Sequence, residues 1–536
     1  MGKKSKRPNH GNGGGGSGKP SSSADGGVAR PAPNLRTPEV ETMENLRFED
    51  PFVEEVAIDD EGDDDVMDDE EEYNDEDDDD DDDDDNEGKE DGGVELIQSW
   101  HPLMGGEQPE ALEMDPTAYK MYHTLTPEWP SLSFDFLRDD LGDARKRFPH
   151  SFMCAVGTQA PQADSNQLTI MKLSDLSKIQ AAEKEEDILG EEYNPDGGDD
   201  SSSSSEEEDI DMEPILEHYS LPHYGGVNRL RAMPQQSSII STWSDAGQVN
   251  VYNVEHILSR FTASQGGGKP AAHKADANKP FFTYAGHPTE GYAMNWSPVQ
   301  QGHLATGDCL GNIHLWTPRE GGGSYQVTPS YDTSSHDDNS KDKDHNPSIE
   351  DLQWSPTEAT VFGAAECGGM IRIYDTRAPH RAMLSHKIHK NGADVNVLSW
   401  NKLVSNLLAT GGDDGTLSVW DLRHFTAASS SSDAKETPEP APLARFSCHK
   451  SPITSVEWHP TDESMLACTD DVGAYIYDLS VEEDDTTINA LDIPPQMLFS
   501  HSGSQEFKEL HWHPQISSCL MTTALTGFSV FIPSNL

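Results

Sequence analysis

The chain has 536 residues, 97 of them acidic and 37 basic, for a net charge of −60. This balance argues against direct binding of nucleic acid, because contacts to phosphates require Lys and Arg. The sequence contains no run of 18 apolar residues, so we expect no membrane span. It has six Cys without a C-x-x-C pair, which argues against a disulfide framework or a zinc ribbon.

Residues 1–36 form a basic, low-complexity tail rich in Gly, Ser and Pro. They hold seven Lys or Arg and a single acid, Asp25. A cluster near the start is a candidate nuclear import signal, made of Lys3, Lys4, Lys6 and Arg7. No apolar leader precedes it, so we expect a nuclear protein rather than a secreted one.

Residues 37–94 form an acidic tail. Within it, residues 59–91 hold 25 acids and one Lys, for a charge of −24. Such crowding of like charge cannot repay the entropy of ordering, so we expect disorder. The segment suits a strongly basic partner, although a solvated spacer is the alternative. Candidate partner-binding residues of the tail are Asp75, Glu76, Asp77, Asp80 and Asp85.

Residues 95–131 are expected to contain an N-terminal helix over residues 116–125. Asp115 fits the N-cap position, and Pro116 fits the first helical position. Met121, Tyr122 and Leu125 would share one face of this helix with their apolar neighbours. The following Glu-Trp-Pro motif, residues 128–130, should end the helical path and begin an extended segment.

Residues 132–536 read as a long series of β-strands. The first are predicted around residues 132–136, 152–158 and 167–173. They are followed by a second acidic stretch, residues 183–213, with 15 acids and one Lys. We expect an acidic loop insert over residues 180–213, in which Ser205 is a candidate phosphorylation site for an acid-directed kinase. A flexible Ser-rich spacer is the alternative.

A repeated pattern fills the second half of the chain. Each copy has a His, a strand ending in Trp, a turn with Gly or Asp, and a strand ending in an aromatic residue. The anchor Trp residues are Trp296, Trp354, Trp400, Trp458 and Trp512, and the closing aromatics follow 19 or 20 residues later. A weaker copy begins at His223. The pattern resembles the WD repeat, one four-stranded blade of a β-propeller.

In WD repeats a His, a Ser or Thr, a turn Asp and the closing Trp bond together within a blade. The matching positions here are His287, Asp308 and Trp316; His389, Asp413 and Trp420; and His449, Asp470 and Tyr477. We interpret these residues as structural rather than catalytic. Glu366 and Leu525 depart from the pattern, so their blades are expected to lack the network.

Six copies leave a propeller one blade short. We therefore expect the strands after residue 132 to supply a seventh blade and to complete the last one, because closing the ring removes exposed sheet edges. The predicted fold is all-β, a seven-bladed WD-repeat propeller with an N-terminal helix and a long disordered acidic tail. No G-x-S-x-G, H-E-x-x-H or Walker-type loop occurs, so we expect neither an enzyme nor a cofactor or metal.

The Glu-Trp-Pro-Ser-Leu motif of residues 128–132, placed before a propeller, resembles the histone-binding WD-repeat proteins of chromatin assembly complexes. The sequence of residues 119–135, which follows an acidic tail, is similar to that of one branch, the glutamate-rich WD-repeat proteins. That resemblance implies a nucleolar ribosome-assembly factor that chaperones large-subunit ribosomal protein three. It also implies a partner groove near Tyr119, Tyr122, Glu128 and Trp129. One departure is that this tail is mainly Asp.

Three functional hypotheses remain open from the sequence. The first is a non-enzymatic chaperone of a basic large-subunit ribosomal protein in 60S assembly. The second is a histone chaperone or a member of a chromatin complex. The third is a substrate receptor of a ubiquitin ligase, suggested by the W-D-x-R-like boxes of residues 374–377 and 420–423.

Overall fold

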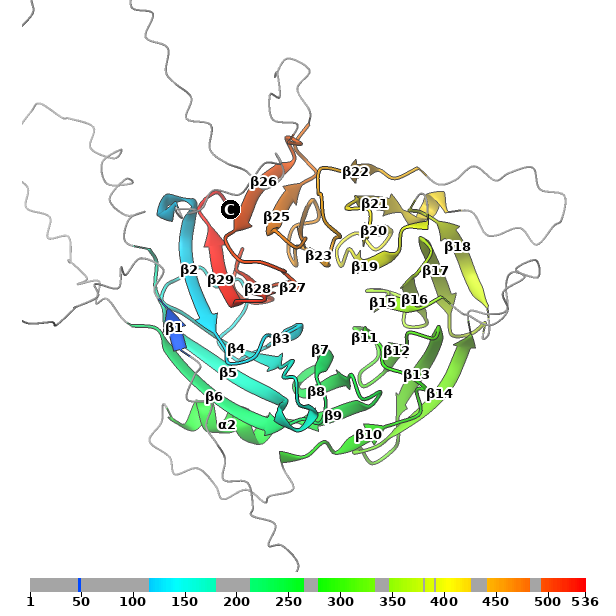
Figure 1. Cartoon of the computed structure of the whole chain (residues 1–536), viewed down its shortest axis with the longest axis horizontal. Coiled ribbons are helices and arrows are strands. Elements are labelled where there is room, and N and C mark those ends of the chain that lie inside the picture. Colours follow the sequence, from blue (N-terminus) through cyan, green and yellow to red (C-terminus); the bar gives the residue numbers. More distant parts are fainter. Residues whose placement is uncertain are drawn as a thin grey trace, which may run out of the picture. The chain divides into compact units, whose positions relative to one another are not determined.

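The computed structural model describes residues 47–49, 115–179, 213–264, 278–332, 347–378, 381–389, 392–425, 441–482 and 493–536. Within these residues the chain forms seven antiparallel sheets, which are the blades of a β-propeller (Figure 1). We number the blades 1 to 7 in chain order of their innermost strands. The predicted seven-bladed propeller is therefore confirmed.

The first four blades each contain four strands. Blade 1 holds β3 (Ser133–Leu137), β4 (His150–Gly157), β5 (Gln167–Leu176) and β6 (Ile215–Pro222). Blade 2 holds β7 (Val227–Met233), β8 (Gln236–Ser244), β9 (Val249–Asn253) and β10 (Phe282–Tyr284). Blade 3 holds β11 (Ala293–Trp296), β12 (Leu304–Gly307), β13 (Asn312–Pro318) and β14 (Tyr325–Asp332). Blade 4 holds β15 (Ile349–Trp354), β16 (Val361–Glu366), β17 (Met370–Asp375) and β18 (Ala382–Lys387).

The last three blades complete the ring. Blade 5 holds β19 (Val395–Trp400), β20 (Leu407–Gly412), β21 (Leu417–Asp421) and β22 (Ala444–Phe446). Blade 6 holds β23 (Ser455–Trp458), β24 (Met465–Thr469), β25 (Gly473–Asp478) and β26 (Met497–Ser502). Blade 7 holds β27 (Glu509–Trp512), β28 (Leu520–Ala524) and β29 (Gly527–Pro533), followed outward by β2 (Tyr119–Thr126) and β1 (Arg47–Glu49).

Short helical segments lie outside the blades. One α-helix, α2 (Glu255–Ser264), follows β9, and its described part packs through Ile257 and Phe261 onto the core between blades 1 and 2. Three 3₁₀ turns cover Pro116–Ala118, Ala163–Ser165 and Leu422–His424. None of the helices in the described part of the chain is long and apolar enough to cross a membrane.

Tight turns with glycine at positive φ join the second and third strands of blades 2 to 5. Gly415 has a φ of +67°, and a Cβ there would lie 2.5 Å from the backbone oxygen of His449. Only glycine adopts such a conformation without strain and permits this close approach. The Asp-Gly turn predicted between β20 and β21 is thus present, and it packs against the loop that enters blade 6.

The ring closes through the N-terminal strands, as the sequence predicted. Innermost strands of successive blades contact one another around the ring, and β27 of blade 7 contacts β3 of blade 1. In addition, β2 pairs with β29, with Leu125 opposite Phe528 and Tyr122 opposite Phe531. Blade 7 is therefore built from strands near both ends of the chain, and the pairing with β2 covers the edge of β29.

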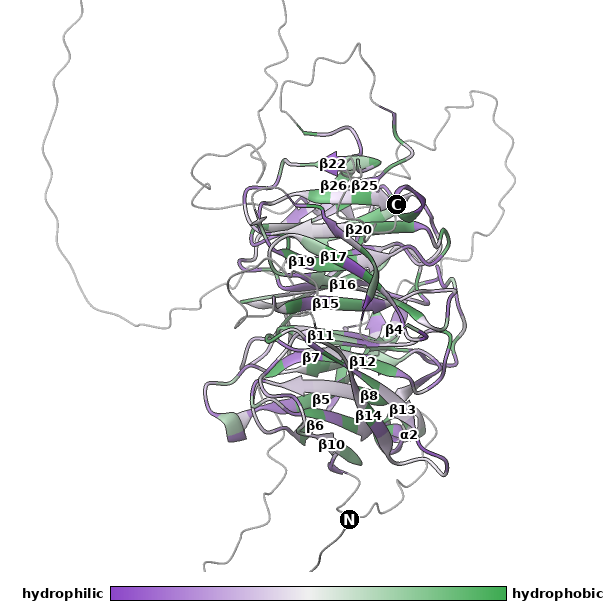
Figure 2. Ribbon diagram, turned by 90° about the vertical axis from the view of Figure 1, so that its right-hand side faces the viewer, coloured by the Kyte–Doolittle hydropathy of each residue, from purple (hydrophilic) through white to green (hydrophobic). Residues whose placement is uncertain are grey.

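The hydrophobic core is divided into seven clusters, each lying between two adjacent blades. The cluster between blades 7 and 1 contains Met121, Phe134 and Phe528, all almost fully buried. The anchor Trp residues fill the equivalent spaces between later blades. Viewed from the side, the strands carry most of the hydrophobic residues and the loops most of the hydrophilic ones (Figure 2). Each blade therefore depends on its neighbours for burial of its faces.

The predicted helix over residues 116–125 is wrong. Asp115 does cap a helical turn, since its Oδ1 accepts a hydrogen bond from Thr117 N (2.9 Å), but the turn ends at Ala118. The chain then runs as β2. Met121 and Leu125 share a face at helical spacing and also at the period of two of a strand. Pairing with β29 decides between these readings, because it satisfies the backbone and buries both side chains.

Other expectations fall on residues that the structure does not describe. These are the import signal at Lys3, Lys4, Lys6 and Arg7, the tail acids between Asp75 and Asp85, and Ser205 in the insert between β5 and β6. Strand β1, residues 47–49, lies within the range expected to be disordered and pairs with β2.

Candidate protein-binding channel

Blade 3 contains the full WD hydrogen-bond network. His287 Nδ1 lies 2.8 Å from Asp308 Oδ2, and His287 Nε2 lies 2.8 Å from Thr306 Oγ1. Trp316 Nε1 donates to the same hydroxyl at 3.0 Å. Burial raises the pKa of Asp308, but the bonds from His287 and Asn312 outweigh it and leave that pKa below its usual value. These polar groups bond to one another inside the blade, so they are structural residues rather than candidate catalysts.

Blade 5 corrects one predicted member of the network. His389 Nδ1 contacts Asp414 Oδ1 at 2.9 Å, whereas Asp413 accepts from Asn396 Nδ2 and is exposed. Trp420 Nε1 donates to Thr410 Oγ1 at 2.9 Å, as expected for the motif. Two consecutive Asp residues precede the turn glycine, and the sequence pattern did not distinguish which of them turns toward the His.

The other networks differ in composition. In blade 6, His449 contacts Asp470 Oδ2 at 3.0 Å and the hydroxyl of Tyr477 at 2.8 Å. In blade 4, the buried Glu366 pairs with Arg372 and accepts from the Tyr374 hydroxyl, so this blade replaces the His–Asp pair with a Glu–Arg pair. Burial raises the pKa of Glu366 to about 7, although Arg372 and the Tyr374 hydroxyl partly offset this effect.

In blade 7 the network includes the N-terminal strand. The hydroxyl of Tyr119 lies 2.8 Å from Nδ1 of the buried His501. Tyr119 is 5% exposed, and its ring packs edge-on against Phe531. The Tyr119 side chain thus joins β2 to blades 6 and 7, and its predicted contact with a partner stays a prediction. Tyr122 stacks on Tyr119 and is half-buried.

Two predicted partner residues remain accessible. Glu128 is exposed and Trp129 is partly exposed, and both lie in the connection between β2 and β3. This connection enters blade 1 at the end of the channel where the innermost strands begin. The two residues thus stay candidates for partner contact.

The innermost strands build a hydrogen-bonded girdle around the channel. At five junctions, the side chain one position before the anchor residue accepts from the backbone N–H of the next blade's anchor residue. The pairs are Asp135 with Ala232 N, Asn295 with Trp354 N, Gln353 with Trp400 N, Ser399 with Trp458 N, and Glu457 with Trp512 N. A second layer, three positions before the anchor, joins Ser133 to Leu230 N, Asp351 to Leu398 N, Ser455 to Leu510 N, and Glu509 to Phe134 N.

Charged groups are paired inside this girdle. Glu509 accepts from Arg229 at 2.7 Å and from Arg231 at 2.8 Å. His511 contacts Glu457 at 3.0 Å and lies 3.6 Å from Glu509. Burial lowers the pKa of His511, but the two carboxylates outweigh this effect and raise that pKa to about 9. The imidazole is therefore a cation at neutral pH.

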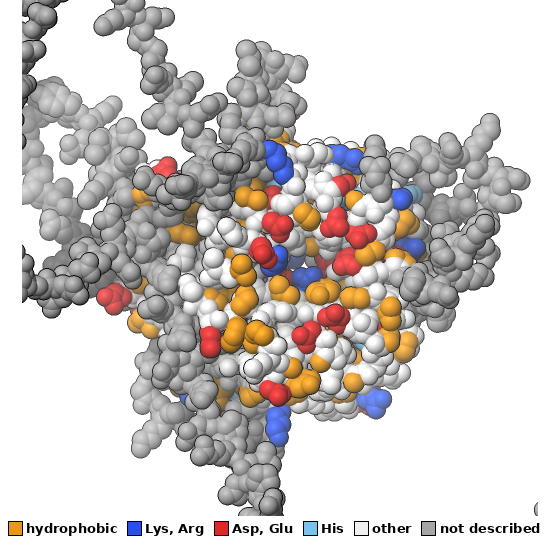
Figure 3. All heavy atoms as spheres, viewed as in Figure 1, with side chains coloured by type: hydrophobic (Ala, Val, Ile, Leu, Met, Phe, Trp, Pro, Cys, Tyr) orange, Lys and Arg blue, Asp and Glu red, His pale blue; other side chains and the backbone are white. Residues whose placement is uncertain are grey.

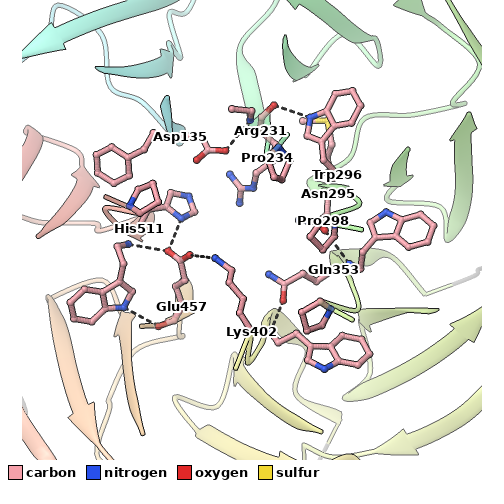
Figure 4. Close-up of a pocket in the computed structure, with 18 of the residues that line it drawn as sticks. Asp135, Arg231, Pro234, Asn295, Trp296, Pro298, Gln353, Lys402, Glu457 and His511 are labelled. Carbon is pink, nitrogen blue, oxygen red and sulfur yellow. Dashed lines mark hydrogen bonds and ion pairs between the residues drawn. The ribbon is translucent and has the colours of Figure 1, made fainter. Parts of the chain in front are cut away.

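One end of the channel, which we call the Trp/Pro end, lies where the innermost strands finish. Here a cavity of about 420 Å³ is surrounded by indole and proline rings (Figure 4). The rings come from a W-x-P pattern: Trp296 with Pro298, Trp354 with Pro356, and Trp512 with Pro514, joined by Trp400, Pro234 and Pro460. Asp135, Arg231, Gln353 and Glu457 form the polar lining below them.

The opposite end, which we call the acidic end, lies where the innermost strands begin. Glu290 precedes β11, Glu350 opens β15, and Asp394 precedes β19. Burial raises the pKa of the Cys309 thiol, and the nearby Glu350 and Glu290 raise it further. The carboxylates of two neighbouring blades, 3 and 4, are therefore close enough to act on one thiol, which gives this part of the rim a negative potential.

Apolar side chains are exposed among these acids. They occupy loops that enter innermost strands or the turns between second and third strands, which reach the same end of the channel. These residues are Tyr224, Leu310, Val472 and Leu525. Figure 3 shows one face of the propeller on which acidic and hydrophobic side chains surround a central hollow that also contains Lys or Arg side chains. Exposed apolar residues within a charged rim are typical of protein-binding surfaces.

The sequence reading missed the channel residues. Their signal is a polar or charged residue one position before each anchor Trp, and also three positions before Trp354, Trp458 and Trp512. No motif in the sequence assigns a role to His511 or His513. Among the described residues no group of three His, Cys, Asp or Glu could hold a metal ion, and the six cysteines are free thiols.

The W-D-x-R-like boxes form two similar surface clamps. Arg377 binds Asp375 through Nε and Nη2, and Arg423 binds Asp421 in the same way. Both arginine side chains are 72% exposed. In each clamp the guanidinium lowers the pKa of the carboxyl to about 2. The arginines are thus held in position while their outer faces remain open to solvent.

Comparison with known proteins gives matches along most of the chain. Residues 109–177 match the family model of the histone-binding protein RBBP4 and its counterpart in the CAF1 complex. Residues 383–421 and 440–472 match the model of the WD domain, G-beta repeat.

Three relatives align with this chain over most of their own length. Ribosome assembly protein rrb1 of Schizosaccharomyces pombe is 36% identical over 80% of this chain and 83% of its own. Protein HEAT STRESS TOLERANT DWD 1 of Arabidopsis thaliana is 38% identical over 82% and 91%. Glutamate-rich WD repeat-containing protein 1 of Dictyostelium discoideum is 37% identical over 80% and 83%. The propeller, its closure by residues 119–126 and these identities together show that the chain belongs to the family of glutamate-rich WD repeat-containing proteins.

Proposed function

We propose that this protein is a non-enzymatic ribosome-assembly factor of the nucleus and nucleolus. It binds a basic protein of the large ribosomal subunit, with large-subunit ribosomal protein three as the proposed client, and releases it to the growing 60S particle. The observation that carries this proposal is the 36% identity, over 80% of the chain, to a protein named for ribosome assembly. The sequence resemblance and the charge of the chain supply the client class.

The acidic end of the channel gives the proposal a physical basis. A basic, RNA-binding surface that has not yet reached the ribosome attracts nucleic acid and other polyanions unless a negatively charged partner covers it. Glu290, Glu350 and Asp394 offer carboxylates on a rigid rim, and exposed apolar residues beside them offer shape. The tail acids of residues 59–91 add an unselective negative charge of −24. Selectivity then comes from the propeller, and fast encounter comes from the summed charge.

Affinity purification of the tagged full-length chain from nuclear extract tests the proposal. We expect one large-subunit ribosomal protein to exceed all histones in the eluate, measured by quantitative mass spectrometry. Recombinant ribosomal protein three should then stay soluble with the full-length chain, and its affinity should fall steeply with salt. A dominance of histones would refute the client. If deletion of residues 54–91 changed neither salt dependence nor client solubility, the role of the tail would be wrong.

A histone-binding chaperone is the second candidate. It is favoured by the match of residues 109–177 to the histone-binding family model. The matched segment includes β2 and the connection with Glu128 and Trp129, which stay accessible at the acidic end. The same purification decides between the candidates, because each predicts a different dominant basic protein.

A substrate receptor of a ubiquitin ligase is the third candidate. It is favoured by the two exposed arginine clamps, Asp375–Arg377 and Asp421–Arg423. If this function holds, Arg377→Ala with Arg423→Ala should remove a ligase adaptor from the eluate and leave the basic client in place. Absence of any adaptor from the wild-type eluate counts against it.

A further inference from the structure

We propose that the Trp/Pro end of the channel is a second binding site, which takes a carboxylate-bearing residue of a partner peptide. This site lies at the end of the innermost strands opposite the acidic end. Its occupant therefore differs in charge from the proposed basic client, and the inference does not depend on that client.

Three carboxylates line the cavity, those of Asp135, Asp351 and Glu457. Asp135 accepts from Ala232 N through one oxygen, whereas the other two carboxylates are engaged at both oxygens. Asp351 accepts from the backbone N–H of Leu352 with one oxygen and of Leu398 with the other. Both oxygens of Glu457 are also engaged, one by Lys402 at 3.4 Å and the other by His511 and Trp512 N. A cationic ligand group would have to break these bonds, some of which join neighbouring blades. The cavity is thus poorly suited to a Lys or Arg side chain.

Hydrogen-bond donors, by contrast, are left over. The amide oxygens of Asn295 and Gln353 accept from the backbone of the next blade, which fixes the orientation of both amides. Their NH₂ groups have no hydrogen-bond acceptor among the described residues. Both side chains are partly exposed and line the cavity, so four N–H donors face it or its edge.

Lys402 is a further donor at the cavity and favours an anionic ligand, and the neighbouring blade holds an indole without a described hydrogen-bond partner. Lys402 replaces the proline of the W-x-P pattern, and its side chain is 56% exposed with one long ion pair to Glu457. The indole Nε1 of Trp354 is buried and has no partner among the described residues. The equivalent Trp296 donates to Arg231 O at 3.0 Å, so the orphan donor is a local departure from the repeat.

The rim defines the rest of the ligand. Indole and proline rings surround the cavity opening and favour an apolar or aromatic neighbour of the carboxylate. A cavity of about 420 Å³ is at the small end of ligand pockets, enough for one or two residues of a peptide. Arg231 and Lys402 lie near the donors and supply positive potential (Figure 4). A peptide such as Phe-Glu-Phe, or an apolar C-terminus, matches these features.

Fluorescence anisotropy of labelled peptides on the full-length protein tests the proposal. The probes are Gly-Phe-Glu-Phe-Gly amide, the neutral Gly-Phe-Gln-Phe-Gly amide, and Gly-Phe-Gln-Phe with a free C-terminal carboxylate. We expect at least one carboxylate probe to bind about tenfold more tightly than the neutral probe. Whether the side-chain or the terminal carboxylate binds better identifies the source of the anion.

Matched variants separate the site from general electrostatics. Asn295→Asp with Gln353→Glu keeps both acceptors for Trp354 N and Trp400 N but turns the free donors into anions. This double variant should weaken binding about tenfold or more. The control Gln301→Glu adds a negative charge at an exposed position of a neighbouring loop and should leave binding within about twofold.

A second variant keeps the test valid if the double variant unfolds. Lys402→Met alters no backbone partner and should weaken carboxylate binding about fivefold. Equal binding of neutral and carboxylate probes overturns the proposal. So does unchanged binding by the folded variants, or the absence of saturable binding by both carboxylate probes up to about 1 mM.

Discussion

Thr306 shows how one hydroxyl organises a blade. Asp308 can only accept, so His287 donates from Nδ1 and must accept at Nε2. The Thr306 hydroxyl therefore donates to His287 Nε2 and accepts from Trp316 Nε1. A single rotatable group thereby fixes a tautomer and joins strands β12 and β13 to the loop that enters the blade.

Thr306→Val should be strongly destabilising although it preserves volume. It leaves a buried indole N–H and a buried imidazole nitrogen without partners, for a loss of roughly 2 to 4 kcal/mol in the free energy of unfolding. Urea denaturation monitored by tryptophan fluorescence measures this loss. Thr317→Val, an exposed position on the neighbouring strand β13, is the control and should change stability by less than about 0.5 kcal/mol. Equal effects of the two substitutions would contradict the network.

His511 makes stability depend on pH. Its pKa is about 6.5 in an unfolded chain and about 9 in the folded protein. A raised folded pKa stabilises fully below pH 6.5, and this contribution is lost as pH rises through 9. We expect the free energy of unfolding to fall by on the order of 2 kcal/mol between pH 6.5 and 9. His511→Gln should remove most of this slope in urea titrations at each pH, and an unchanged slope would refute the assignment.

At the scale of single elements, β2 is the clearest case of tertiary context overriding local sequence. Residues 115–118 carry a helix-start signal, and the structure follows it for one turn. The next residues have spacings compatible with a helix or a strand, and the deciding partner, β29, lies about 400 residues away in sequence. Local pattern carries no information on such a pairing.

The blades were far more predictable than the site. Anchor Trp residues 46 to 58 positions apart and a constant distance to the closing aromatic indicated the propeller and its closure. Asp413 was chosen in place of Asp414 because adjacent residues satisfy the same spacing. The channel could not be predicted because its residues come from seven different blades and are far apart in the sequence. Glu509 and His511, for example, contact residues of other blades. Only the ring brings Arg229, Arg231 and Glu509 together.

Tyr119→Phe tests the structural role of β2. The substitution removes the hydroxyl that meets His501 and leaves a buried imidazole nitrogen unpaired, so stability should fall by roughly 1 to 2 kcal/mol. Binding of ribosomal protein three below the melting temperature should be unchanged. Glu128→Gln is the converse variant: it should leave stability unchanged and slow client association. A binding defect in folded Tyr119→Phe would instead support the predicted partner contact of this residue.

At the scale of the whole propeller, the innermost strands of all seven blades run in the same direction along the channel. Every such strand begins at the acidic end and finishes at the Trp/Pro end, so any residue type repeated near a strand start forms a rim. In Figures 1 and 4 the blades follow one another in opposite senses, so these views look along the channel from opposite ends. The carboxylates of the acidic end and the free amide donors of the Trp/Pro end are thereby separated by the length of a strand.

The acidic end should control how fast a basic client binds. Glu290→Gln with Glu350→Gln and Asp394→Asn removes three negative charges from the rim but keeps side-chain size. We expect association of ribosomal protein three to slow by about tenfold at low salt, with a smaller salt dependence, because charge at a rim acts mainly on the encounter rate. Stopped-flow fluorescence at several salt concentrations measures both quantities. A matched control, Glu358→Gln with Glu463→Gln and Glu482→Gln, removes three charges in other loops. Equal slowing by both triple variants would mean that net charge, rather than the acidic end of the channel, directs the client to the propeller.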